Sequence, residues 1–154
     1  MTIRKGNIDD LAELQQLFVD TVSNVCKVDY NSDQISVWTS SIENEKRWRD
    51  ILTNQFVLVA QDRKKIAGFC TLDNGNYIDL LYIHQNYQRQ GIARKLYADI
   101  EKEARRQRQT ELTSDVSKTA RPFFEIVGFK MLKEQSISLK GVELTNYKMT
   151  KGLD

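Results

Sequence analysis

The segment around Gly91 most constrains the fold of this chain, because a strand pattern there runs through a short loop into a helix pattern. Residues 77–83, Tyr-Ile-Asp-Leu-Leu-Tyr-Ile, are rich in the aromatic and aliphatic side chains typical of a strand. After the loop 88–93, Gln-Arg-Gln-Gly-Ile-Ala, apolar residues recur every four positions at Ile92, Leu96, Ile100 and Ala104. This spacing predicts an amphipathic helix over residues 91–107.

The start of this predicted helix is a candidate phosphate site. The first backbone N–H groups of a helix have no partner within it and lie at the positive end of the helix dipole. Gly91 and Ala93 are small and leave that backbone accessible. The loop matches neither a P-loop, which needs Gly-Lys-Ser/Thr, nor the three spaced glycines of a dinucleotide site. A plain helix entry is the alternative interpretation.

The rest of the chain alternates between strand and helix patterns. Strands are predicted at residues 2–5, 56–60, 65–72, 77–84, 111–116, 130–139 and 144–150. Helices are predicted after Asn7, at residues 32–52 with a break near 43–44, at 91–107, and at 119–127 before Gly128. The order βααβββαβαββ predicts an α/β (α+β) sandwich with a mixed central sheet flanked by helices.

Composition indicates an ordinary globular chain. A length of 154 residues suits one domain covering residues 1–154. Because 23 basic residues face 21 acidic ones, the net charge of +2 gives no case for a nucleic-acid partner. The densest basic run, residues 102–108, ends a predicted helix, where cations complement the dipole; a patch for an acidic partner is the alternative.

Targeting and metal signals are absent from the sequence. No apolar run reaches signal-peptide or membrane-spanning length, so a cytoplasmic protein with no membrane partner is expected. Cys26 and Cys70 fit neither a zinc site nor a disulfide framework and are expected to be reduced core residues. No metal is expected to be required.

Two segments carry a family resemblance. Residues 88–93 resemble the Gln/Arg-x-x-Gly-x-Gly/Ala signature of the GCN5-related N-acetyltransferases (GNAT). Residues 117–129, Ser-Lys-Thr-Ala-Arg-Pro-Phe-Phe-Glu-Ile-Val-Gly-Phe, resemble the second fingerprint of that family. The tail, residues 141–149, resembles a bacterial subgroup whose substrates are largely unassigned. The resemblance covers about residues 1–150 and implies the GNAT fold and transfer of an acetyl group from acetyl-CoA to an amine.

The resemblance also implies which residues bind acetyl-CoA. The backbone N–H of Leu81 would stabilise the thioester carbonyl oxygen, and Ile83 would pair with the pantetheine arm like an added strand. The full set of expected cofactor-binding residues is Leu81, Ile83, Gln88, Arg89, Gln90, Gly91, Ile92, Ala93, Ser117 and Phe124.

A general base is expected on the strand that precedes the signature. In the family this group lies six or four residues before the last aliphatic residue of the strand, which gives Tyr77 and Asp79 when counted from Ile83. Asp79 is the only carboxylate there and is the predicted base, acting directly or through a water. Since an aspartate is ordinarily a weak base unless burial strengthens it, binding of the substrate ammonium or a structural ion pair are alternatives.

The leaving thiolate presents a departure from the family pattern. The tyrosine that usually protonates the sulfur falls at Phe124, which has no proton to give. Either the thiolate leaves unassisted, which a thiol pKa of about 8.5 allows, or Tyr82 or Ser117 takes the role. The enzyme is then expected to be slow but active. The alternative function is a catalytically weak acyl-CoA-binding or regulatory module.

The acceptor amine is expected to bind against the helical region of residues 28–52. Tyr30, Gln34 and Trp38 lie four apart and would share one helix face, with Tyr77 as a further wall of the cleft. The alternative is that the tryptophans anchor this segment to the core. The expected acceptor is a primary amine of a small molecule or peptide, acetylated directly in a ternary complex. A monomer and a homodimer both remain open.

Overall fold

The computed structural model describes residues 1–154. Its strands are β1 (Thr2–Lys5), β2 (Phe56–Asp62), β3 (Lys65–Asp73), β4 (Tyr77–Ile83), β5 (Glu111–Ser117), β6 (Lys130–Leu139) and β7 (Val142–Gly152). Its α-helices are α1 (Leu11–Asn24), α2 (Ser32–Thr39), α3 (Glu45–Asn54), α4 (Ile92–Arg106) and α5 (Arg121–Ile126). Short 3-10 turns are η1 (Ile8–Asp10), η2 (Cys26–Val28), η3 (Ser40–Glu43) and η4 (Gln85–Tyr87).

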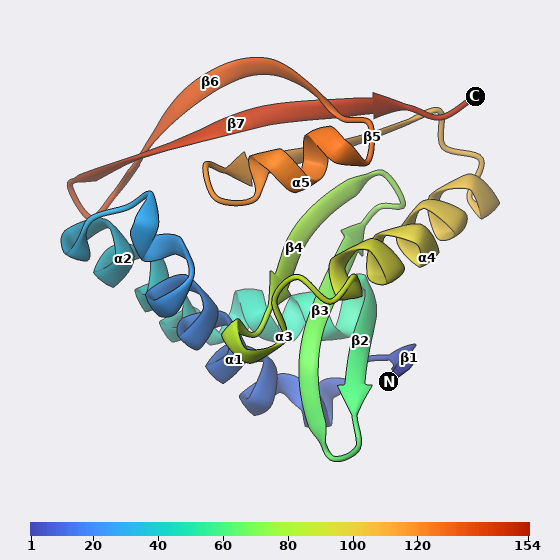
Figure 1. Cartoon of the computed structure of the whole chain (residues 1–154), viewed down its shortest axis with the longest axis horizontal. Helices are drawn as coiled ribbons and strands as arrows, with labels where there is room; N and C mark the ends of the chain where they lie inside the picture. Colours follow the sequence, from blue (N-terminus) through green and yellow to red (C-terminus); the bar gives the residue numbers. More distant parts are fainter.

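All seven strands form one sheet, in the order β1-β2-β3-β4-β5-β7-β6. Every neighbouring pair is antiparallel except β4 and β5, which run parallel. The helix α4 makes the crossover between these two strands, as parallel neighbours require. The sheet is strongly curved, so that β6 and β7 arch over the rest of the molecule (Figure 1).

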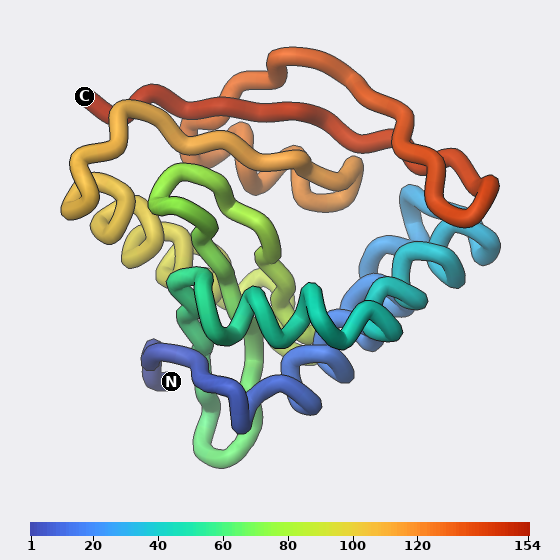
Figure 2. Tube along the Cα trace, turned by 180° about the vertical axis from the view of Figure 1, so that it is seen from behind, coloured from blue at the N-terminus to red at the C-terminus, as the bar shows by residue number.

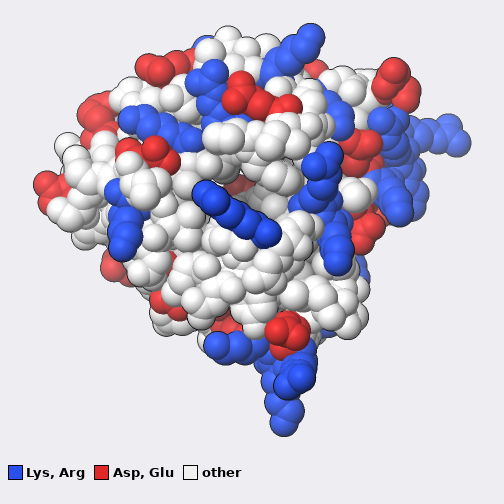
Figure 3. Space-filling model, viewed as in Figure 1, with Lys and Arg blue, Asp and Glu red and all other residues white.

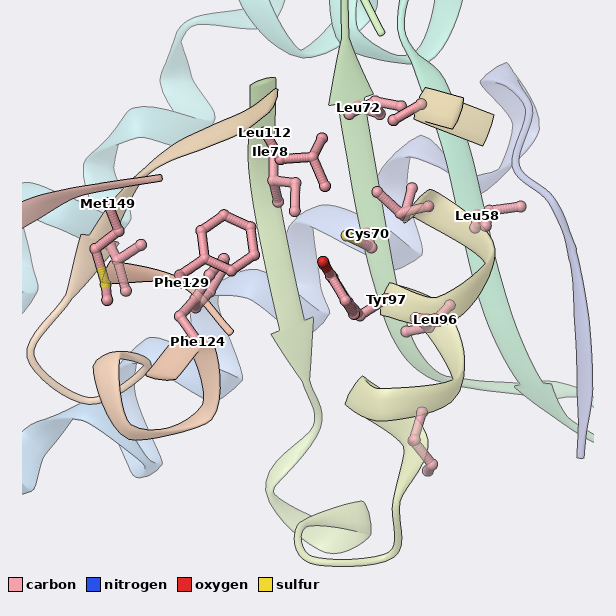
Figure 4. Packing of buried hydrophobic residues seen from close by; sticks show 14 of the residues in the cluster. Leu58, Cys70, Leu72, Ile78, Leu96, Tyr97, Leu112, Phe124, Phe129 and Met149 are labelled. Carbon is pink, nitrogen blue, oxygen red and sulfur yellow. The ribbon is translucent and has the colours of Figure 1, made fainter. Parts of the chain in front are cut away.

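Helices cover both faces of the sheet. The amphipathic helix α4 lies in front of β2 and β3, and α1 and α3 lie behind them (Figures 1 and 2). Two buried clusters result. The first joins α4 to α5 and includes Leu96, Ile100 and Phe124, while the second joins α1 to α3 and includes Phe18 and Trp48. Figure 4 shows residues of the first cluster, with Phe124 and Phe129 to the left of β4 and Cys70 and Leu96 to its right, and Tyr97 packs edge-on against Phe129 at 5.9 Å.

A polar contact fastens the far end of α4 to β7. Glu101 accepts hydrogen bonds from Tyr97 Oη at 2.7 Å, Lys151 Nζ at 2.6 Å and Arg105 Nε at 3.1 Å. Burial would raise the pKa of Glu101, but these three donors outweigh it and lower the pKa to about 2.

The main irregularity of the sheet lies between β4 and β5. Only Tyr77 with Thr113 and Ile78 with Ser114 are paired, after which the strands separate. Ser114 Oγ donates to Ile78 O at 2.7 Å at the point of divergence. From there β4 continues to Ile83 and β5 to Ser117 without a shared ladder, leaving a gap within the sheet.

The predicted fold class and element order are confirmed, except that residues 32–52 divide into the two helices α2 and α3 with the turn η3 between them. The expected break in residues 32–52 occurs where Asn44 accepts a hydrogen bond from Arg47 N and begins α3. Cys26 and Cys70 are both buried and unpaired, as expected. None of the helices combines the length and the apolar character needed to cross a bilayer.

Candidate active site

A cleft of about 220 Å³ occupies the gap between β4 and β5. Its walls come from both separated strands, from α2, α3 and α5, and from the β6–β7 hairpin. The lining residues are Tyr30, Trp38, Arg47, Ile78, Asp79, Leu80, Leu81, Tyr82, Ser114, Asp115, Val116, Ser117, Ala120, Phe124, Ile137, Leu139, Leu144, Thr145 and Asn146. The space-filling view shows a hollow at the centre of the molecule with a basic side chain lying across it (Figure 3).

The backbone of β4 presents unused hydrogen-bonding groups to this gap. His84 N donates to Ala67 O at 2.8 Å, which makes those two residues a hydrogen-bonded pair of the β3–β4 ladder. In an antiparallel ladder such pairs alternate, so Leu81, opposite Cys70, and Ile83, opposite Gly68, direct their backbone groups away from β3. The strand on that side is β5, which has already diverged. The N–H of Leu81 therefore faces the cleft, where the sequence predicted an oxyanion donor.

A β-bulge at Asp79 changes the face of the sheet to which the following side chains of β4 point. Leu72 pairs with Ile78 and Thr71 with Leu80, so Asp79 is an extra residue with no partner on β3. The buried Thr71 hydroxyl accepts a hydrogen bond from Leu80 N at 3.1 Å and so replaces a backbone acceptor at the bulge. Because of the extra residue, Ile78 joins the first core cluster and Leu80 the second.

The carboxylate of Asp79 is held by two side chains from α3 and its end. Arg47 donates to Oδ1 at 2.9 Å, and Gln55 donates to Oδ2 at 2.7 Å. The Asp79 side chain is only 10% exposed, whereas that of Arg47 is 46% exposed. Gln55 Oε1 is buried without a partner beside this pair. Each carboxylate oxygen keeps one further acceptor position, but the ion pair already neutralises the charge of the group.

The entry to α4 has the geometry of an anion site. Gly91 caps the helix at φ +78°, and the first helical hydrogen bond runs from Lys95 N to Gly91 O. The N–H groups of residues 92–94 are therefore free of helix partners. A Cβ on Gly91 would have nothing within 4 Å, so open space lies in front of this backbone. Arg89, itself at φ +60°, and Arg94 flank the site and form no ion pair within the protein.

Other residues predicted to bind the cofactor have roles inside the protein. Gln88 donates to Ile83 O at 2.5 Å, and Gln90 makes a long contact of 3.5 Å with Asn86 O. Ser117 Oγ accepts from Ala120 N at 3.0 Å and thereby shapes the turn into α5. Its hydroxyl proton remains available on the cleft wall.

Phe124 and Tyr82 lie on opposite sides of β4. Phe124 is 3% exposed, packs edge-on against Phe129 at 5.0 Å and belongs to the first core cluster. Tyr82 packs edge-on against Phe18 at 5.0 Å with the second cluster, and burial raises the pKa of its hydroxyl. This placement does not favour Tyr82 as a proton donor near Phe124, since the bulge and strand alternation send it to the other face.

The structure divides the predicted acceptor residues. Tyr30 and Trp38 line the cleft and pack edge-on at 5.2 Å. Gln34 does not line it, because its side chain caps α2 together with Asn31 and donates to Glu143 O at 2.9 Å. Tyr77 is also outside the lining, and its hydroxyl donates to Asp115 Oδ2 at 2.7 Å. The structure therefore brings Tyr30 and Trp38 to the cleft and places Gln34 and Tyr77 outside its lining.

Sequence reasoning missed three polar residues at the site: Arg47, Gln55 and Asp115. Arg47 and Gln55 reach Asp79 from 32 and 24 residues away, and only the docking of α3 brings them together. Asp115 lies on β5 just beyond its last pair with β4. Its polar side chain in the alternating run 111–117 was the one available signal.

Tyr30 joins the two sides of the cleft. Its hydroxyl donates to Thr145 O on β7 at 2.6 Å and accepts from Lys118 N, after β5, at 3.0 Å. Burial raises the pKa of Tyr30 to about 12, so the hydroxyl keeps its proton at neutral pH.

Comparisons with known proteins agree with this geometry. The Acetyltransferase (GNAT) domain family matches residues 26–151. The chain is 33% identical over 147 residues to YafP, an uncharacterised N-acetyltransferase of Escherichia coli K12, covering 96% of this chain and 93% of that protein. A GCN5-related N-acetyltransferase from Rhodopseudomonas palustris superposes with a TM-score of 0.94 at 29% identity, over 99% of this chain and 95% of the other.

A more distant structure has a bound ligand. The PaiA N-acetyltransferase of Thermoplasma acidophilum, solved in complex with coenzyme A, has a TM-score of 0.81 at 19% identity, over 99% of this chain and 98% of the other. At this identity the likeness shows a shared fold.

Proposed function

Because the chain belongs to the GCN5-related N-acetyltransferase (GNAT) family, we propose that it transfers an acetyl group from acetyl-CoA to a primary amine by direct attack in a ternary complex. The observation that carries this proposal is the divergence of β4 from β5 after two residue pairs. It leaves a hollow within the sheet, bordered by the backbone N–H of Leu81, next to the open start of α4.

Acetyl-CoA fits the residues around this gap. The pyrophosphate would meet the free N–H groups of residues 92–94, with Arg89 and Arg94 beside it. The pantetheine arm would pair with the exposed edge of β4 at Ile83, where its groups displace the Gln88 amide from Ile83 O. The complex of the PaiA enzyme with coenzyme A supports the same ligand here.

The chemistry proposed for the site is a nucleophilic substitution at the thioester. The amine nitrogen forms a bond to the carbonyl carbon, the C–S bond breaks, and the sulfur leaves with the electron pair. Leu81 N–H donates to the carbonyl oxygen as negative charge develops on it. The amine loses a proton, which Asp79 accepts directly or through a water. The proton binds at an acceptor position that Arg47 and Gln55 leave free.

Departure of the thiolate proceeds without a tyrosine at position 124. Phe124 lines the cleft with a hydrocarbon ring, and Ser117 places a hydroxyl on the cleft wall. A thiol with a pKa of about 8.5 is a tolerable leaving group at neutral pH, so we expect modest turnover. Because Phe124 cannot donate a proton, it also favours the second candidate function, an acyl-CoA-binding module with little catalytic activity.

The test is acetyl-CoA turnover against a panel of primary amines, read as free thiol. Asp79→Asn is assayed in parallel with Asp50→Asn, an exposed aspartate paired with Lys46 on α3. We expect wild-type turnover to fall at least about tenfold in Asp79→Asn and to be unchanged in Asp50→Asn. Equal turnover in the wild type, Asp79→Asn and Asp50→Asn refutes the assignment of Asp79 as the general base. Tight acetyl-CoA binding with no turnover on any amine favours the binding module.

A further inference from the structure

We propose that Asp115 binds the ammonium group of the acceptor, and that the acceptor is a small amine with a single positive charge and an apolar body. This inference rests on the proposed acetyl transfer and specifies its second substrate. Three observations support it: the charges of the cleft, the position of Asp115 and the closed shape of the acceptor end.

The charges that line the cleft do not cancel. Only Arg47, Asp79 and Asp115 among the lining residues carry charge. Arg47 and Asp79 neutralise one another through their contact at 2.9 Å. Asp115 is an exposed residue that forms no ion pair: Tyr77 Oη donates to its Oδ2 at 2.7 Å and Gln135 Nε2 donates to its Oδ1 at 2.7 Å, while Lys148 lies opposite it on β7 without reaching the carboxylate. Two neutral donors therefore orient this carboxylate, and its negative charge is the one on the cleft wall that no ion pair neutralises.

Asp115 is placed where a reacting amine must be. Ile78 and Ser114 form the last pair of the parallel ladder, so Asp79 and Asp115 are the first residues beyond it on the two strands. The two carboxylates therefore flank the narrow end of the gap. Asp79 lies two residues before Leu81 on β4, and Asp115 lies across from it on β5. An ammonium held by Asp115 lies beside Asp79, which accepts its proton before attack.

The acceptor end of the cleft is closed by the β6–β7 hairpin. Tyr30 Oη donates to Thr145 O at 2.6 Å, Gln34 Nε2 donates to Glu143 O at 2.9 Å, and Lys140 pairs with Glu43 at 3.6 Å. Figure 1 shows the tip of this hairpin resting beside α2. These contacts hold the hairpin against α2 and narrow this end of the cleft, and a cleft of about 220 Å³ suits a small molecule.

The walls near this end are mainly apolar and aromatic. They include Tyr30, Trp38, Tyr82, Leu139 and Leu144. Such walls suit a hydrocarbon or aromatic body and offer neither a second carboxylate for a polycation nor a free cation for an acidic substrate. The one cation, Arg47, is already paired with Asp79.

The experiment measures steady-state kinetics with three probes: 2-phenylethylamine, spermidine and phenylalanine. We expect kcat/KM for 2-phenylethylamine to exceed both others at least tenfold. Asp115→Asn should raise KM for 2-phenylethylamine at least tenfold, while Glu111→Gln, an exposed change on the same strand, leaves it unchanged. Preference for spermidine or phenylalanine, or a KM within twofold of wild type in Asp115→Asn, overturns the inference.

Binding measurements separate this inference from the proposed function. Titration calorimetry gives the affinity for acetyl-CoA, and quenching of tryptophan fluorescence gives the affinity for each amine in the absence of turnover. If the wild-type protein does not bind acetyl-CoA, the acetyltransferase proposal is refuted. The amine affinities of wild type and Asp115→Asn still test the role of Asp115 in that case. If the protein binds acetyl-CoA but not 2-phenylethylamine, the inference about the acceptor is refuted and the acetyltransferase proposal is not. Asp115→Glu keeps the charge and should retain binding, which distinguishes loss of charge from misfolding.

Discussion

Replacing Gly91 by alanine should have two separate effects: backbone strain lowers Tm, and the added methyl group lowers the affinity for acetyl-CoA. Gly91 has φ +78°, where a Cβ costs about 1–2 kcal/mol, and the added methyl group touches nothing within 4 Å. For a chain of this length that is a fall in Tm of roughly 2–8 °C. The methyl group enters the space in front of the free N–H groups of α4. Weakening one or more charged hydrogen bonds there, worth about 1.5–3 kcal/mol each, should reduce acetyl-CoA affinity roughly 10- to 100-fold.

Gly141 provides a matched control for this change. It lies in the turn between β6 and β7 at φ +80°, and a Cβ there also has nothing within 4 Å. Gly141→Ala should therefore lower Tm by a similar amount and leave acetyl-CoA affinity at the wild-type value. Differential scanning calorimetry and titration calorimetry on both variants supply the two readouts. Equal acetyl-CoA affinities in Gly91→Ala and Gly141→Ala would contradict the assignment of the α4 entry as the pyrophosphate site.

Four further changes have defined outcomes. Glu101→Gln should destabilise the protein at pH 7 but not at pH 2 in urea unfolding. The reason is that a folded pKa of about 2 lies below the unfolded value of about 4.3, so the stabilisation is lost as pH falls between them. Tyr30→Phe leaves two backbone groups without their partner and should lower the unfolding free energy by about 2–4 kcal/mol, a loss that Tyr147→Phe should not reproduce. Thr71→Val should cost about 1–3 kcal/mol by unpairing Leu80 N–H, whereas Thr71→Ser keeps the acceptor and the stability; equal losses in both would refute the role of the hydroxyl. Phe124→Tyr should raise kcat at least tenfold if an absent proton donor limits turnover, and an unchanged kcat shows that thiolate departure is not limiting.

Local patterns were sufficient to predict the element order. The four-residue spacing from Ile92 to Ala104 defines the buried face of α4, and all four of its apolar residues are buried. Asn44, an N-cap residue, begins α3 at the break that the sequence predicted near residues 43–44. These features depend on residues close together in the chain, so a single sequence contains the information.

The details of the candidate site depend on contacts that sequence spacing does not encode. Helical spacing placed Gln34 with Tyr30 and Trp38, but Tyr30 precedes the helix, and the amide of Gln34 in its first turn is used in the capping box. The bulge at Asp79 shifts the alternation of β4, and at the bulge Leu80 N–H is satisfied by the hydroxyl of Thr71 on the neighbouring strand. Arg47 meets Asp79 only because α3 packs behind the sheet, so no local pattern identified the ion pair.

The short ladder between β4 and β5 has a consequence for how the protein survives in a cell. It divides the sheet into a portion of four strands and a portion of three, joined by two residue pairs. Hydrogen exchange should be fastest, and proteolytic nicking most frequent, along this seam when the gap is empty. A ligand that spans the gap adds stability by mass action, about 2.7 kcal/mol when its concentration is 100 times Kd. The lifetime of the protein would then follow the supply of acetyl-CoA, so that the polypeptide is degraded fastest when its own substrate is scarce.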